Sequence, residues 1–247
     1  MGKRILVRRR GKGGMQWRAP SKGKIAPAKY PLFKSEELVT GRIIDLVHER
    51  GRSAPLCKVS FNGSIDYIPA VTGLTVGSDI YMGASAPIQH GSVLPLASIP
   101  EGSEICNIER RFGDGGKFVR VSGSSAILFS KTGGNSIIRF PSGKSFIVSS
   151  NCRASLGKIA GGGKTEKPFL RAGPRYYAKM AKNQQYPRVR GIAMAAVYHP
   201  FGGGRHQHPG KSTSTSRNAP PGRKVGLIAP KKTGRKRITR GPIEVIR

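Results

Sequence analysis

The chain has 247 residues, with 44 Lys and Arg against 12 Asp and Glu, and a formal net charge of +32 at pH 7. Such a charge destabilises a compact state by self-repulsion unless a polyanion neutralises it. Nucleic acid is the partner that this charge favours, and an anionic membrane surface is the alternative. No apolar run approaches the roughly 18 residues of a membrane span, and the basic start lacks the apolar region of a secretory signal. We therefore expect a cytoplasmic protein without a membrane partner.

The charge is segregated along the chain. Residues 1–34 carry 11 cations and no anions, whereas residues 35–115 carry 6 cations and 10 anions. Residues 116–190 carry 15 cations and 1 anion, and residues 191–247 carry 12 and 1. This pattern is typical of a protein that faces a phosphate lattice with part of its surface. The three cysteines, Cys57, Cys106 and Cys152, are far apart and form no C-x-x-C pair, which indicates reduced thiols.

The pattern predicts an all-β fold in four segments. Residues 1–34 form a basic arm, which is either a solvated tail or a tail that orders along RNA, with Trp17 available for stacking or packing. Residues 35–115 are expected to form an OB-like barrel and residues 116–190 an SH3-like barrel. Residues 191–247 form a basic Gly/His-rich extension, ordered by RNA and mobile without it.

Short strands separated by turn clusters at a spacing of roughly 8–12 residues favour a small barrel in the first β segment. The expected strands are 41–49, 58–61, 66–69, 79–82, 92–95 and 104–109, with a turn at Asn62 to Ser64. In the second β segment we expect strands at 121–129, 136–140 and 145–148, with a tight turn at Pro141 to Lys144. His48 and His90 have no neighbouring ligand cluster and are read as ordinary core or surface residues.

A short helix is expected from Tyr176 to Gln185, limited by Pro174 before it and Pro187 after it. Three cations would lie near one face of this helix, and Tyr176, Tyr177 and Tyr186 alternate with them. Two interpretations stay open here: a platform on which RNA bases stack, or tyrosines that pack on a barrel.

The stretch from Tyr186 to Lys211 holds three of the five histidines and three consecutive glycines, and it contains no acidic residue. Glycine loses more backbone entropy on folding than any other residue, so such a run marks either a flexible loop or a close backbone approach to a ligand. Peptide N–H groups, guanidinium groups and imidazoles together suit a phosphate. The basic surroundings favour the phosphate interpretation.

Enzymatic sites are poorly supported. Gly157 to Thr165 resembles a phosphate-binding P-loop, but Gly157 stands one residue too early and no strong helix follows. His199, His206 and His208 have no Cys or acidic neighbour to complete a metal site, and Ser212 to Ser216 lack a local carboxylate for a catalytic triad. We therefore expect neither a catalytic residue, a metal nor a cofactor.

Three blocks carry a family resemblance: Val189 to Met194, His199 to Lys211, and Ala219 to Ala229. Together they resemble the universal second protein of the large ribosomal subunit, in its archaeal and eukaryotic branch, over nearly the whole chain. Ala195 and Tyr198 depart from the family, where Asn and an acidic residue are common. Without that carboxylate a special protonation state, and hence catalysis of peptide transfer, is harder to argue for His199.

The resemblance implies the same pair of barrels and a structural role bound to large-subunit ribosomal RNA near the peptidyl transferase centre. It also implies neighbouring ribosomal proteins, the small subunit at the interface, and support of tRNA binding. The residues that we expect to contact RNA, from motif position and charge, are Arg8, Arg9, Arg10, Trp17, Arg18, Lys164, Arg171, Arg175, Arg188, Arg190, His199, Gly202, Gly203, Gly204, Arg205, His206, His208, Lys211, Arg217, Arg223, Lys224 and Arg235.

Two other classes remain open from the residues. An RNA chaperone or translation factor would show similar barrels and charge but would exchange on and off its target. An RNA-modifying enzyme would need a cofactor site, and no motif marks one.

Overall fold

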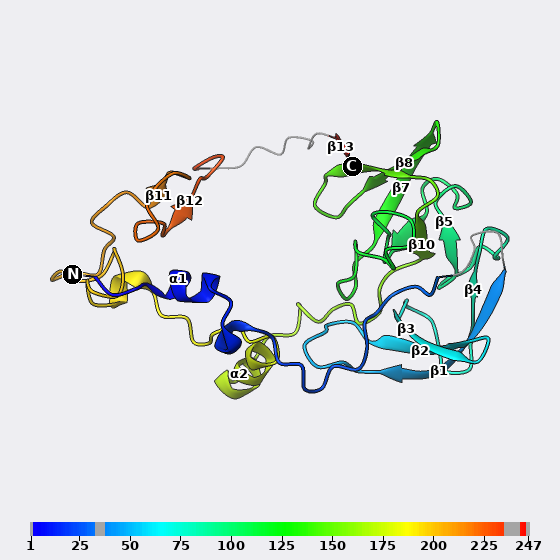
Figure 1. Ribbon diagram of the computed structural model, residues 1–247, viewed down its shortest axis with the longest axis horizontal. Helices are drawn as coiled ribbons and strands as arrows, with labels where there is room; N and C mark the ends of the chain where they lie inside the picture. Colours follow the sequence, from blue (N-terminus) through cyan, green and yellow to red (C-terminus); the bar gives the residue numbers. More distant parts are fainter. Residues whose placement is uncertain (1, 33–37, 235–242, 246–247) are drawn as a thin grey trace. The chain divides into compact units, whose positions relative to one another are not determined.

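A computed structural model describes residues 2–32, 38–234 and 243–245 (Figure 1). Its strands are β1 (Val39–Val47), β2 (Leu56–Phe61), β3 (Ser64–Pro69), β4 (Asp79–Met82), β5 (Val93–Pro95), β6 (Glu104–Cys106), β7 (Ala126–Thr132), β8 (Asn135–Arg139), β9 (Ser145–Ser149), β10 (Arg153–Leu156), β11 (Ser214–Thr215), β12 (Leu227–Ile228) and β13 (Ile243–Val245). The helices are α1 (Leu6–Gly11) and α2 (Ala172–Met180), with 3-10 turns η1 (Met15–Trp17) and η2 (Gly191–Ala193). The prediction of an all-β fold is confirmed.

One sheet of 11 strands runs in the order β13-β9-β8-β7-β6-β10-β5-β4-β1-β2-β3, and β11 pairs with β12 separately. The pairs are antiparallel except β4 with β5, β13 with β9, and β11 with β12. The β2–β3 hairpin turns at Asn62 and Gly63, both with positive φ (47° and 84°). Asn-Gly is the sequence that such a two-residue turn favours. The predicted turn at residues 62–64 is thereby explained.

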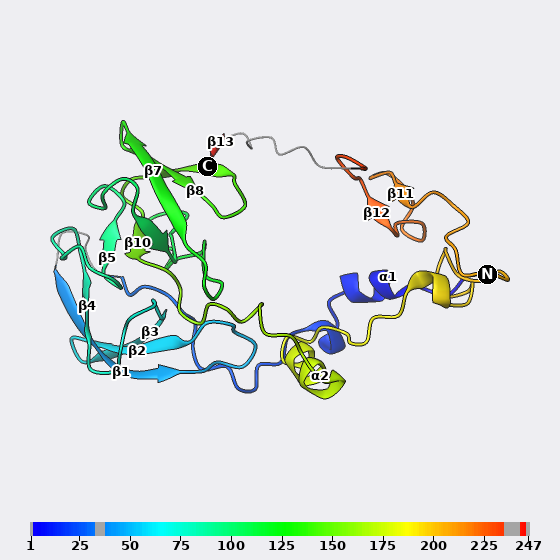
Figure 2. The ribbon, with the colours of Figure 1, turned by 180° about the vertical axis from the view of Figure 1, so that it is seen from behind.

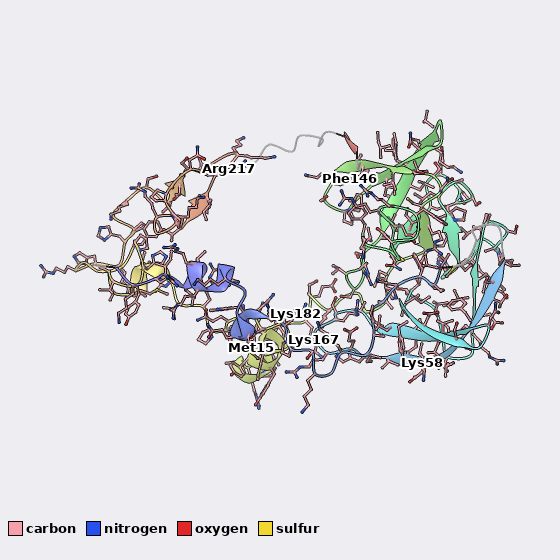
Figure 3. The ribbon with its side chains drawn as sticks, viewed as in Figure 1. Met15, Lys58, Phe146, Lys167, Lys182 and Arg217 are labelled. Atoms are coloured by element: carbon pink, nitrogen blue, oxygen red, sulfur yellow. The ribbon has the colours of Figure 1, made fainter. Side chains whose placement is uncertain are left out.

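Two hydrophobic cores lie within this sheet unit. One packs Ile43, Val59 and Phe61 among other residues of β1–β5, and the other packs Leu94, Ile105 and Leu128 among residues of β5–β10. Phe146 of β9 adds an aromatic contact with Phe140, with ring centroids 4.8 Å apart (Figure 3). The predicted segment boundaries at residues 34, 115 and 190 stay predictions.

The three cysteines are buried free thiols. Cys57 lies in the first core and Cys152 in the second, whereas Cys106 belongs to a smaller third cluster with Ala54, Val71 and Ile159. Burial raises the pKa of Cys57 and Cys106 to about 12. Burial is also the largest of the causes that raise the pKa of Cys152 to about 11. A protonated buried thiol is a small hydrophobic side chain, so these residues serve packing and not redox or metal chemistry.

Two strand predictions were misplaced for local reasons. Residues 121–125 form a turn before β7, because Ser124 bonds the carbonyl of Val121 and Gly123 packs against the backbone of Gly162. The strand expected at 104–109 ends at Cys106, because Asn107 takes a left-handed backbone conformation with φ of 47°. A residue there cannot continue the pleat.

The helix expected at 176–185 begins earlier, at Ala172, and ends at Met180. Pro174 lies inside its first turn and not before it. A proline is tolerated there because the first backbone N–H groups of a helix have no partner within the helix.

A buried ion pair joins several segments of the sheet unit. Arg153 of β10 donates to Glu109 from Nη2 (2.8 Å) and Nε (3.2 Å), and its backbone N–H donates to the same carboxylate (3.0 Å). Gly115 N–H adds a fourth bond (3.2 Å), and Arg153 Nη1 donates to the carbonyl of Pro31 (2.9 Å). Every charge is therefore matched by neighbours, which a buried pair requires if it is not to destabilise the fold.

We expect Glu109→Gln to lower the free energy of unfolding by about 3–5 kcal/mol, because it leaves the Arg153 cation buried without its counter-ion. The measurement is urea unfolding of the full chain. Glu104→Gln is the matched control: Glu104 pairs with Lys158 at 3.2 Å, but the two side chains are 45% and 53% exposed. Solvent screens such a pair, so the control is expected to cost no more than about 1 kcal/mol. Equal losses for both variants would contradict this account.

Candidate nucleic-acid interface

The chain divides into two compact units, and the β sheet described above belongs to residues 23–168 and 243–245. The other unit combines residues 2–22 with residues 169–234. By sequence, residues 1–22 hold 8 Lys and Arg, residues 169–238 hold 16, and neither range holds an Asp or Glu. This unit therefore contains 24 cations that no carboxylate of its own can neutralise.

The basic unit also buries almost nothing. Among its described residues only Ile5, Thr215 and Val225 are buried. Burial of apolar side chains is the main favourable term in folding, and three residues supply little of it. The order of this unit is therefore not explained by an apolar core, and hydrogen bonds and glycine packing contribute to it.

The N-terminal segment contacts the segment of residues 183–198 in this unit, which the sequence did not predict. Lys3 N–H donates to the carbonyl of Val197 (2.9 Å), and Lys3 Nζ lies 5.3 Å from the centre of the Tyr198 ring. Farther along, Asn183 Nδ2 donates to the carbonyls of Gln16 (2.5 Å) and Arg18 (2.7 Å). Figures 1 and 2 both show residues 2–11 beside the segment around residue 197. Residues 2–18 are thus attached to this unit and are not a separate tail.

The glycine-histidine loop has a defined backbone. Gly202 N–H donates to the carbonyl of His199 (2.9 Å), and Gly203 N–H donates to that of Met194 (3.0 Å). A Cβ on Gly202 would collide with the carbonyl oxygens of Met194 and Ala195. The glycine is required by close backbone packing, so the interpretation of a merely flexible loop does not describe residues 199–203.

His199 is the side chain around which this loop closes. Its Nδ1 accepts the backbone N–H of Phe201 (3.1 Å), and a Cβ on Gly191 would strike its ring. Partial burial lowers the pKa of His199 by desolvation. Both features favour the neutral imidazole with its proton on Nε2, because an acceptor nitrogen carries no proton. The ring then offers one N–H donor to a partner, without a positive charge.

A hollow of about 400 Å³ lies beside this histidine. It is lined by two segments far apart in the sequence: Gly2, Lys3, Arg4, Ile5 and Arg8 from one, and Ala196, Val197, His199, Pro200 and Gly222 from the other. Lys3, Arg4 and Arg8 bring three cations and no acidic side chain faces them in this lining. An anion such as a phosphate is the group that suits these walls.

The structure places most of the predicted contact residues in this unit. Exposed cations stand on α1 (Arg8, Arg9, Arg10), at the end of η1 (Arg18), on α2 and its start (Arg171, Arg175), and on the following loops (Arg188, Arg190, Arg205, Lys211, Arg217, Arg223). Gly202 to Gly204, His206, His208 and the half-buried Lys224 lie there too. Lys164 is exposed in the sheet unit, and Arg235 lies outside the described residues.

Trp17 has a packing role on this geometry. It is half-buried, and its Nε1 is covered and has no hydrogen-bond partner.

The residues that sequence reasoning missed are Lys3, Arg4, Asn183 and Gly191. The sequence shows the charge of Lys3 and Arg4 and gives no signal for Asn183 or Gly191, because the contact between the N-terminal segment and residues 183–198 has no sequence motif.

No group of three or more His, Cys, Asp or Glu that could hold a metal ion occurs in the described part of the chain. His208 Nδ1 instead lies 2.8 Å from the carbonyl oxygen of His206. Within the same residues, no helix is long and apolar enough to cross a membrane.

An all-β unit joined to a carboxylate-free basic unit is the organisation of a ribonucleoprotein component. The family described as "Ribosomal Proteins L2, C-terminal domain" matches residues 89–224. The chain is 51% identical to the large ribosomal subunit protein uL2 of Cenarchaeum symbiosum, over 96% of this chain and 98% of that protein. It is 50% identical to uL2 of Nitrosopumilus maritimus and 47% identical to uL2 of Desulfurococcus amylolyticus, over 96% of this chain in each case and 98% and 100% of those proteins.

The chain belongs to the uL2 family of large ribosomal subunit proteins. The resemblance drawn from residues 189–229 is confirmed, as is its archaeal type. The chain is a structural constituent of the large subunit and not an enzyme.

We expect Gly202→Ala to weaken incorporation of the protein into large subunits by roughly 5- to 100-fold, because overpacking of a closed loop costs about 1–3 kcal/mol. The measurement is competition between tagged variant and wild-type protein during reconstitution. Gly14→Ala is the matched control, since a Cβ there meets nothing within 4 Å and the φ of −57° suits alanine. Equal incorporation of both variants would show that the loop geometry does not matter for assembly.

Proposed function

We propose that this chain binds large-subunit ribosomal RNA through its basic unit, while the sheet unit supplies the folded body that positions it. What supports RNA as the ligand most directly is the set of 24 cations without a carboxylate in residues 1–22 and 169–238. These side chains cannot form ion pairs within their own unit. Phosphates of a folded RNA neutralise them and release condensed counter-ions, which is a large favourable term in nucleic-acid binding.

The His199 loop is the proposed centre of this interface. Neutral His199 presents its Nε2 proton, and Lys3, Arg4 and Arg8 line the hollow beside it. One uncharged donor within a cationic wall suits a sugar-phosphate backbone, where both phosphate and hydroxyl oxygens accept hydrogen bonds. We assign His199 a binding role. Its neighbour Tyr198 is engaged by Lys3 and supplies no carboxylate for proton transfer.

Other cations of the basic unit are further proposed phosphate ligands: the exposed Arg188, Arg190, Arg205, Lys211, Arg217 and Arg223, and the half-buried Lys224. Lys164 of the sheet unit is proposed as a separate phosphate ligand. On the resemblance of residues 189–229 alone, we extend the proposal to support of the peptidyl transferase region, subunit association and tRNA binding. Neighbouring ribosomal proteins and the small subunit are the further partners that this role requires.

Arg205→Gln tests the proposed phosphate contacts. We expect it to reduce the slope of log affinity against log salt concentration by about 0.7–0.9, which corresponds to one phosphate contact. The measurement is binding of the full chain to large-subunit ribosomal RNA at several salt concentrations.

The matched control is Arg52→Gln, which removes the same charge from the sheet unit, where Arg52 Nε lies 2.7 Å from Glu49. Its slope is expected to equal that of the wild type. Equal slopes for Arg205→Gln and the wild type, or a fall of the same size in both variants, would contradict the assignment of the basic unit as the RNA-binding surface.

A further inference from the structure

Helix α2 (Ala172–Met180) buries none of its side chains. Tyr176 is 47% exposed and Tyr177 is 70% exposed, and Leu170 just before the helix is 91% exposed. A nine-residue helix is too short to be stable in water by its own hydrogen bonds, so helices of this length depend on packing of one face. The interpretation that these tyrosines pack on a barrel does not fit their exposure.

Hydrogen bonds hold the C-terminal end of α2. Asn183, three residues beyond the helix and with φ of 50°, donates to the backbone carbonyls of Gln16 in η1 and of Arg18 just after it. In Figure 3 the labelled side chains of Met15 and Lys182 mark the two segments that this residue joins. The N-terminal end has neither a capping side chain nor an acidic residue in its first turn. The helix is thus anchored at one end, with its aromatic surface left for a partner.

The charges around this surface select an anionic partner. Arg171, Arg175, Lys179 and Lys182 lie within six residues of the tyrosines in the sequence, and residues 169–238 contain no carboxylate. Arg175 lies over the ring of Tyr186, 5.2 Å from its centre, so its guanidinium already faces an aromatic surface. Charge complementarity therefore favours RNA, and not a protein with an apolar groove, as the partner that binds the exposed face of α2.

The angle between the two rings defines the kind of RNA. The rings of Tyr176 and Tyr177 meet edge to face, with centroids 5.6 Å apart and planes at 79°. Bases that stack on two perpendicular rings cannot be consecutive members of one continuous base stack. This geometry requires nucleotides that are splayed apart, as in a bulge, a loop or a sharp turn.

We propose that α2 is a stacking platform for unpaired bases of ribosomal RNA, with Tyr177 as the main ring and Tyr176 as the second. This inference rests on the proposed function, because it names the RNA feature that one part of the basic unit recognises. The four cations hold the backbone of the splayed nucleotides, and the two rings hold their bases.

The test compares two probes with the full chain at one salt concentration: a 12-nucleotide oligouridylate and a 12-base-pair RNA duplex. Tyr177→Leu keeps an apolar side chain that suits a helix, and Tyr177→Phe keeps the ring. We expect Tyr177→Leu to weaken oligouridylate binding by roughly 5- to 100-fold, the range for one base-aromatic stack. Duplex binding is expected to stay unchanged, and Tyr177→Phe is expected to behave as the wild type.

If Tyr177→Leu has the same ratio of oligouridylate to duplex affinity as the wild type, the proposal of a stacking platform is overturned, while the proposed RNA binding stands. Loss of a neighbouring protein from reconstituted subunits, with that ratio unchanged, also overturns it and identifies a protein as the occupant. Failure of the wild-type chain to bind either probe or ribosomal RNA contradicts the proposed function itself. A circular dichroism spectrum equal to that of the wild type establishes that the variant is folded.

Discussion

The absence of any carboxylate from residues 1–22 and 169–238 is the constraint on which the rest of this molecule depends. All 12 acidic residues lie in the remainder of the chain, where they accompany 20 cations. The basic unit has no internal counter-charge, and among its described residues it buries only three side chains. The uncompensated charge and the lack of a core both oppose a compact state of this unit on its own, which is the physical basis of the proposed RNA binding.

The sheet unit, in contrast, is stabilised by buried apolar side chains and by buried charges that have partners. It holds two hydrophobic cores, and its buried charge is matched on every side: Glu109 accepts four hydrogen bonds within 3.2 Å from Arg153 and Gly115. Tyr30 ties the preceding segment into this network, because its hydroxyl lies 2.8 Å from the carbonyl of Asn107 and 2.7 Å from Ser155 Oγ. Desolvation by burial raises the pKa of Tyr30 far above its usual range, so the hydroxyl stays a donor. One chain thus combines a unit that has its own cores and matched buried charge with a basic unit that has neither.

Much of this organisation could be predicted from the sequence. Alternation of apolar residues placed β1 to β6 and β8 to β9 within a few residues, and Asn62-Gly63 marked a hairpin. β10 was missed because Arg153 opens it, and a buried arginine is visible only once Glu109 is known to lie opposite. The contact between the N-terminal segment and the segment around Val197 was missed because a backbone hydrogen bond, such as that from Lys3 N–H to the Val197 carbonyl, does not depend on residue type. The glycine-histidine stretch was found by composition, but the packing of His199 against Gly191 follows from tertiary contacts alone.

Hydrogen exchange of backbone amides in the full chain, with and without large-subunit ribosomal RNA, tests most directly whether the basic unit is ordered by its ligand. In the free protein we predict slow exchange in β1–β10 and fast exchange throughout residues 2–22 and 169–234. On RNA binding the amides of Gly202 and Gly203 are predicted to become protected, together with those of Asn183 and the α2 segment, while the sheet changes little. Protection of residues 169–234 in the free protein equal to that of the sheet would contradict the account.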